Sequence, residues 1–127
     1  MAPIKIFVAD KEVEPAMEVL NSLGTGEVQL VFASKMSRAL ASLKNAEYSV
    51  IFLGDRVEDG DTYDLGVLIN STKRNRQTPV ICIGAHVSKR TKLAGLLKPR
   101  SMAVDVSDKD AAQVCADKIR DHLNGHK

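Results

Sequence analysis

The chain has 127 residues, of which 44% are hydrophobic and 27% charged, and its formal net charge is +2. This composition is typical of one globular domain, so residues 1–127 are expected to form a single domain, either a whole protein or the first domain of a longer one. No apolar run approaches the roughly 20 residues that span a bilayer, and the start of the chain lacks a signal peptide, so we expect a cytoplasmic protein without a membrane anchor.

Apolar runs alternate with helical patterns along the whole chain. Runs rich in β-forming residues predict strands at 4–9, 28–32, 50–53, 80–83 and 103–106. Apolar residues at helical spacing follow each run, and Gly24 is expected to end the first helix. The expected caps of the later helices are Ser34, Asp61 or Thr62, Ser88, and Asp108. Residues 55–61 read as a polar loop.

Strand–helix repeats of this kind predict an α/β fold, because parallel strands need right-handed helical crossovers. The expected architecture is a doubly wound, five-stranded parallel sheet between two helical layers, a (βα)5 flavodoxin-like sandwich. Functional sites in such sheets lie at the carboxyl ends of the strands. The sequence places four polar segments there: Asp10-Lys11-Glu12, Gly54-Asp55, Gly84-Ala85-His86 and Ser107-Asp108-Lys109.

Two cysteines lie within apolar patterns, Cys82 in the fourth strand and Cys115 in the last helix. Neither belongs to a CxxC motif or to a cluster of cysteines and histidines. We therefore expect two core thiols and no zinc site.

Four segments resemble the CheY-like receiver domain of response regulators: IKIFVADKE, YSVIFLGD with its acidic loop, TPVICIGA, and the last helix. The resemblance covers nearly the whole chain. It implies an aspartate at the end of the third strand that accepts a phosphoryl group, and acidic residues after the first strand that bind magnesium. It also implies a hydroxyl residue after the fourth strand and a lysine after the fifth. Cations and hydroxyl donors are needed there because a carboxylate must attack an anionic phosphate.

The sequence departs from this pattern at almost every one of these positions. Gly54 stands where the family has its acceptor aspartate, and Gly84 stands where it has the hydroxyl residue. Asp10 is kept, but Lys11 replaces a second acid. Lys109 lies late after the fifth strand and lacks the proline that follows the family's lysine. These substitutions predict a degenerate receiver that has no catalytic residue and needs no cofactor.

Asp55 is the alternative phosphoacceptor. A one-residue slip along a strand turns the side chain to the opposite face, so Asp55 needs a bulge at Gly54 to point toward Asp10. In that case Asp10 and Asp55 would form a weak magnesium site, and magnesium would be the cofactor of an active receiver.

Residues 65–104 contain eight basic residues and no acidic residue, although the whole chain has 18 basic and 16 acidic residues. The basic residues after the third helix and at the start of the fourth are predicted to form a partner-binding surface. Its residues are Lys73, Arg74, Arg76, Lys89, Arg90 and Lys92. The expected partner is a protein with an acidic surface, or a second copy of the chain. Nucleic acid is not expected, because only 4% of residues are aromatic and a stacking platform is lacking.

These observations favour a pseudo-receiver of a bacterial two-component or phosphorelay pathway that acts by protein–protein interaction. Two alternatives stay open. The first is a divergent active receiver that is phosphorylated on Asp55 with magnesium. The second is a flavodoxin-like module that binds a small ligand or nucleotide, although GTG at 24–26 follows a helix and not a strand.

Overall fold

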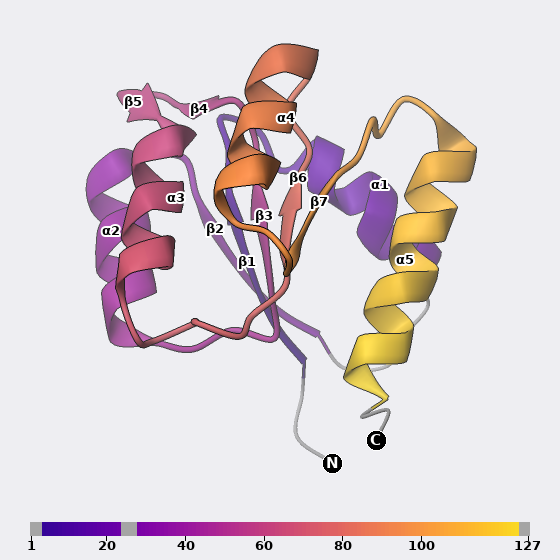
Figure 1. The fold of residues 1–127 in the computed structure, drawn as a ribbon, viewed down its shortest axis with the longest axis horizontal. Helices are drawn as coiled ribbons and strands as arrows, with labels where there is room; N and C mark the ends of the chain where they lie inside the picture. The colour runs from indigo at the N-terminus through magenta and orange to yellow at the C-terminus, as the bar shows by residue number, and fades with distance from the viewer. Residues whose placement is uncertain (1–3, 24–27, 125–127) are drawn as a thin grey trace.

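The computed structural model describes residues 4–23 and 28–124 of the chain (Figure 1). The five strands of the main sheet are β1 (Ile4–Ala9), β2 (Val28–Ala33), β3 (Val50–Leu53), β6 (Val80–Cys82) and β7 (Ser101–Ala103). All are parallel, and their order across the sheet is β2-β1-β3-β6-β7. The predicted doubly wound parallel sheet is therefore confirmed.

Helices cover both faces of the sheet (Figure 1). They are α1 (Glu14–Leu23), α2 (Met36–Asn45), α3 (Thr62–Ser71), α4 (Val87–Leu96) and α5 (Lys109–Leu123). Helices α1 and α5 pack against each other on one side of the sheet, and α3 lies next to both α2 and α4 on the other. Gly24 and the GTG segment lie outside the described residues.

The side chains of each buried strand alternate between two hydrophobic clusters, one on each side of the sheet. Phe7, Ile51 and Leu53 belong to the cluster beneath α2, α3 and α4. Ile6 and Phe52 belong to the cluster beneath α1 and α5. The strands are apolar on consecutive positions because both faces are covered.

Both cysteines are free and buried, as predicted, but in different clusters. Cys82 lies with the residues beneath α3 and α4, and Cys115 lies beneath the opposite face of the sheet. Burial raises the pKa of each thiol to about 12. Neither thiol is therefore ionised near neutral pH.

The structure corrects two of the predicted elements. The last strand is β7 at Ser101–Ala103 and not at 103–106, because its residues pair in register with Val80 to Cys82 of β6. The loop after β3 contains a small antiparallel hairpin, β4 (Arg56–Val57) and β5 (Gly60–Asp61). Val57 is fully buried, so its side chain packs this hairpin against the hydrophobic core.

Two of the four predicted helix caps are wrong. Asp61 accepts a hydrogen bond from the Tyr63 N–H at 2.8 Å, and Asp108 caps α5, both as predicted. In contrast, Lys35 and not Ser34 occupies the cap position of α2, and His86 and not Ser88 occupies that of α4. Neither Lys35 nor His86 makes a side-chain cap bond.

Among the described residues no helix is long and apolar enough to cross a membrane.

Candidate functional site

A crevice of about 670 Å³ lies at the carboxyl ends of the strands. Its lining comes from the segments that follow β1, β3, β6 and β7, together with the first turns of α4. The charged residues of this lining are Asp10, Lys11, Glu12, Asp55, Arg56, Lys89, Arg90 and Asp105. Residues from each of the four predicted strand-tip segments line this crevice, although Asp108 and Lys109 do not, and the crevice carries both signs of charge.

Gly54 follows β3 directly, and the carboxylate of Asp10 lies over it. A Cβ atom built on Gly54 would overlap all three atoms of the Asp10 carboxyl group. The Gly54 N–H donates to the Ala9 carbonyl at 2.9 Å, so the backbone of this residue continues the sheet pairing beyond β3. The side-chain volume that Gly54 lacks is thus already filled by the aspartate of the neighbouring strand.

The environment of Asp10 disfavours its charged form. The pKa of the Asp10 carboxyl is raised to about 6, chiefly by burial and to a smaller extent by the nearby Asp55 and Glu12 carboxylates. Hydrogen bonds from the backbone N–H groups of Lys11 and Glu12 oppose this effect. Asp10 therefore holds its proton to a higher pH than an ordinary aspartate does.

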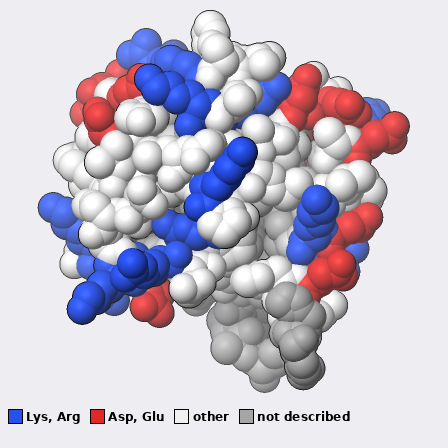
Figure 2. Space-filling model, in the orientation of Figure 1, with Lys and Arg blue, Asp and Glu red and all other residues white. Residues whose placement is uncertain are grey.

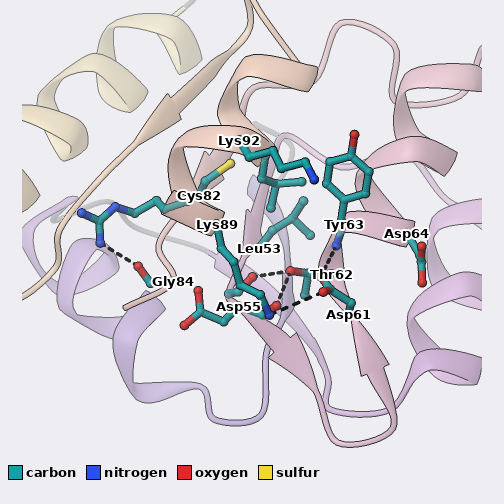
Figure 3. Close-up of a pocket in the computed structure, with 13 residues that line it drawn as sticks. Leu53, Asp55, Asp61, Thr62, Tyr63, Asp64, Cys82, Gly84, Lys89 and Lys92 are labelled. Atoms are coloured by element: carbon teal, nitrogen blue, oxygen red, sulfur yellow. Dashed lines mark hydrogen bonds and ion pairs between the residues drawn. The ribbon is translucent and has the colours of Figure 1, made fainter. Parts of the chain in front are cut away.

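Asp55 points toward the loop between β6 and α4 (Figure 3). Its Oδ2 accepts hydrogen bonds from the Ala85 N–H at 3.0 Å and from the His86 N–H at 3.2 Å. A Cβ atom on Gly84 would overlap the Asp55 carboxylate. The glycine at the end of β6 therefore leaves room for Asp55, in the same way as Gly54 leaves room for Asp10.

The lysine predicted from the resemblance is not part of the crevice. Lys109 is the first residue of α5 and is exposed, and it does not line this cavity. The cation on the crevice wall that contacts a strand tip is Arg90, whose Nη1 donates to the Gly84 carbonyl at 2.7 Å. Arg90 also lies close enough to Asp105 to help lower the pKa of that carboxyl, after the larger effect of the hydrogen bonds from Ser107.

The two carboxylates nearest these strand tips already accept hydrogen bonds from backbone N–H groups, Asp55 from Ala85 and His86, and Asp10 from Lys11 at 2.7 Å. In the described part of the chain, no three His, Cys, Asp or Glu side chains are grouped to hold a metal ion. Magnesium binding by Asp10 and Asp55 stays a prediction, and we derive no chemistry from it.

A second, smaller cavity of about 200 Å³ lies between the first turns of α3 and α4 (Figure 3). Leu53, Cys82 and Leu93 form its apolar floor. At its rim, Lys89 pairs with Asp61 at 3.4 Å, and the Lys92 ammonium lies 4.9 Å from the centre of the Tyr63 ring. These rim contacts join α4 to the start of α3.

The predicted basic surface is divided between the two ends of the sheet. Lys89 and Lys92 lie on the first turns of α4, at the carboxyl ends of the strands, whereas Lys73, Arg74 and Arg76 follow the end of α3. A helix of ten residues is about 15 Å long, so the two groups are well separated. Figure 2 shows basic side chains at the upper and lower ends of this face and also between them, with acidic side chains beside both groups.

Solved structures of response regulators resemble this chain over nearly its full length. The phosphorylated cyanobacterial phytochrome response regulator RcpA matches with a TM-score of 0.75 at 13% identity, over 98% of this chain and 96% of that one. The chemotaxis response regulator CheY4 of Vibrio cholerae matches with a TM-score of 0.70 at 12% identity, over 93% and 99%. The chain has the receiver-domain fold.

The receiver fold is shared with little sequence in common. Another match is the response regulator TrrA of Thermotoga maritima, solved in complex with Mg²⁺-BeF, with a TM-score of 0.70 at 18% identity, over 91% of this chain and 98% of that one. No family model matches the chain. No curated protein matches it in sequence.

Three residues at this end of the sheet make contacts that the sequence does not predict. Arg90 is predicted as part of a partner-binding surface, but it reaches back to Gly84. The Thr62 hydroxyl lies within hydrogen-bond distance of the Gly54 and Asp55 carbonyls, at 2.5 and 2.9 Å. Asp59 in the small hairpin accepts from the Met36 N–H at 2.7 Å. No sequence signal indicates these remote contacts, because the sequence offers Ser34 and Ser88 as caps for α2 and α4, whereas Lys35 and His86 occupy the cap positions.

Proposed function

We propose that this chain is a receiver-like signalling domain that acts by binding another protein, in the cytoplasm of a bacterium and as part of a signal transduction pathway. In this proposal it is not an enzyme, and no aspartate needs to be phosphorylated for it to work. The fold supports the signalling role, because proteins described as response regulators share it over nearly the whole chain.

The observation that carries the proposal is the pair of glycines at the strand tips. At both Gly54 and Gly84, an aspartate from a neighbouring segment occupies the space of the missing side chain. The space beside both glycines is thus occupied by Asp10 and Asp55, and neither glycine supplies the acceptor carboxylate or the hydroxyl that the receiver resemblance implies at its position. This arrangement supports recognition more than group transfer.

Phosphorylation is tested by intact-mass spectrometry after incubation with acetyl phosphate and magnesium. We expect no mass increase of a phosphoryl group. The Asp55→Asn variant is the matched control, since it removes the one acceptor that the sequence offers next to Gly54. An adduct on the wild type that disappears in this variant would show that Asp55 is phosphorylated and would overturn the proposal.

The start of α4 is the surface best suited to a protein partner with an acidic surface. Lys89 and Lys92 oppose the dipole at the start of α4, so their charges are not explained by stabilisation of that helix. Val87 beside them is 64% exposed. An apolar side chain flanked by cations fits a partner that presents carboxylates around an apolar contact.

Charge reversal at the two ends of the molecule tests this assignment. Proteins captured by the wild type are compared with those captured by Lys89→Glu/Lys92→Glu and by the matched control Lys73→Glu/Arg74→Glu. We expect the first variant to lose a partner that the control retains. If only the control variant lost the partner, the interface would lie at the end of α3 instead. Analytical ultracentrifugation over a range of concentrations shows whether that partner is a second copy of the chain.

Small-ligand binding is a second candidate, because the crevice volume of about 670 Å³ lies within the range of ligand sites. A thermal-shift screen with nucleotides and small metabolites tests it. A saturable rise in the melting temperature would favour this candidate. The same rise in an Asp10→Asn/Arg90→Ala variant would place the ligand elsewhere.

A further inference from the structure

The loop that leads into α4 has no nearby acidic or cap side chain that accepts from its N–H groups. His86 occupies the cap position and makes no side-chain cap bond, and the first turn of α4 contains no acidic residue. Lys89 in this turn adds a positive charge where the helix dipole is already positive. By local sequence alone, the N–H groups of Ala85 and His86 would be left to solvent.

Asp55 supplies the missing anion from a segment 30 residues earlier. Its Oδ2 lies 3.0 Å from the Ala85 nitrogen and 3.2 Å from the His86 nitrogen, and its Oδ1 lies 3.4 Å from the His86 nitrogen. Hydrogen bonds from backbone N–H groups to a carboxylate are stronger than those to a neutral acceptor. One carboxylate therefore satisfies two consecutive N–H groups of the loop.

The surroundings keep Asp55 in this position. The Thr62 hydroxyl contacts the carbonyls of Gly54 and Asp55 and so fixes the backbone that carries the carboxylate. Gly84 leaves space for it, since a Cβ atom there would lie 2.6 Å from the Asp55 Cγ. On the other side of the loop, Arg90 binds the Gly84 carbonyl.

We propose that Asp55 is a built-in anion that holds residues 84–86 in one conformation and closes this niche to free anions. The start of α4 is then presented in the same way with or without a ligand or a phosphoryl donor. Removing the carboxylate would open a niche for a small oxyanion such as acetate or phosphate. The inference depends on contacts within the chain and does not require the proposed partner.

The experiment combines anion titration with amide NMR on the full chain. Spectra of ¹⁵N-labelled wild type and Asp55→Gly are recorded while sodium acetate or inorganic phosphate replaces sodium chloride at constant ionic strength. We expect no saturable shift of the Ala85 and His86 amides in the wild type. In Asp55→Gly, the melting temperature should fall by about 3–6 °C. Acetate should restore part of that loss and shift both amides saturably.

Asp59→Gly is the matched control, because Asp59 also binds a remote backbone N–H, that of Met36. This variant should lose stability and leave the Ala85 and His86 amides in their wild-type positions. If Asp55→Gly does not fold, Asp55→Asn replaces it, since the amide keeps the shape and removes the charge. Its Ala85 and His86 amides should then differ from those of the wild type.

Three results would overturn the inference: a saturable response of the wild-type amides to either anion, wild-type amide shifts in a folded Asp55 variant, or no response of a folded Asp55→Gly to acetate. None of them bears on phosphorylation or on the partner. Failure of this inference and failure of the proposed function are therefore distinguishable.

Discussion

At the scale of single residues, the shape of the crevice depends on two aspartate side chains. Each occupies the space that a Cβ atom would take at a glycine. Asp10 lies over Gly54, and Asp55 lies over Gly84. Each aspartate comes from a segment far away in the sequence, so neither pairing is visible in a local motif. These two placements decide which carboxylates line the crevice at the strand tips.

Asp10 gives a prediction about pH. Because its pKa is raised to about 6 in the folded state, the native protein binds a proton that the unfolded chain has already released. Stability should therefore fall as the pH rises from about 4 to about 6, and stay level above it. Asp10→Asn removes this penalty and should be more stable than the wild type at pH 7.5, by about 1 kcal/mol after allowance for the partial exposure of the group.

Urea unfolding of both proteins at pH 4.5, 6.0 and 7.5 measures this difference. The advantage of Asp10→Asn should shrink toward pH 4.5, where Asp10 of the wild type is protonated. A difference that does not change with pH would show that Asp10 does not titrate in this range.

Asn75 is a second residue whose role comes from its contacts. It is buried with a φ of 64°, and its Oδ1 accepts from the Tyr48 N–H at 2.7 Å, while its Nδ2 donates to the Ala46 carbonyl at 2.9 Å. Asn75 lies in the loop after α3, which ends at Ser71. Asn75 therefore joins the loop after α3 to the segment before β3.

Asn75→Ala should destabilise the protein by about 3 kcal/mol, since it leaves a buried N–H unpaired and puts alanine in left-handed backbone. Asn75→Gly also removes the side-chain hydrogen bonds but adopts the left-handed backbone without strain, so it should lose less. Urea denaturation measures both. Equal losses would indicate that the side-chain hydrogen bonds, and not the backbone conformation, are the main contribution.

At the scale of secondary structure elements, the helices begin in two different ways. Helices α3 and α5 carry their own caps, Asp61 and Asp108, and these were predictable from sequence. Helices α2 and α4 rely on carboxylates from the segment that contains the hairpin. Asp59 accepts from a backbone N–H at the start of α2, and Asp55 accepts from a backbone N–H just before α4. The short hairpin therefore contacts the start of two helices that flank α3.

Two helical glycines give a prediction about packing between α3 and α4. A Cβ atom on Gly66 of α3 would lie 2.6 Å from the Leu93 Cδ1 of α4, whereas a Cβ atom on Gly95 would meet nothing within 4 Å. Gly95→Ala should stabilise the protein by about 0.5–1 kcal/mol through helix propensity alone. The free energy of unfolding of Gly66→Ala should be lower than that of Gly95→Ala by roughly 1–2 kcal/mol, because Leu93 must move to make room for the new methyl group.

Thermal unfolding of the two alanine variants under one set of conditions compares them directly. Equal stabilities would show that α3 and α4 separate at little cost.

At the scale of the whole molecule, the sheet separates two hydrophobic clusters, each with one buried thiol. Cys82 lies on the side of α3 and α4, and Cys115 on the side of α1 and α5. Because β1, β3 and β6 send side chains to both clusters, we expect the two layers to unfold together.

Thiol labelling in increasing urea tests this expectation. Both cysteines should resist labelling in the native state, since each is fully buried. The labelling rates of Cys82 and Cys115 should then rise with the same dependence on urea. A Cys115 that reacts at lower urea would show that the layer of α1 and α5 opens separately. Cys82→Ala and Cys115→Ala identify which thiol reacts.

The sequence by itself determined the order of strands and helices, the two-sided burial of the sheet and the glycines at the ends of β3 and β6. These are local properties, since hydrophobic periodicity and single-residue identity do not depend on distant neighbours. The tertiary structure alone decided where Asp55 and Arg90 point, and that the basic residues lie at opposite ends of the sheet. The physical reason is distance along the chain: Asp55 binds N–H groups 30 and 31 residues away, and only the packed sheet brings them together.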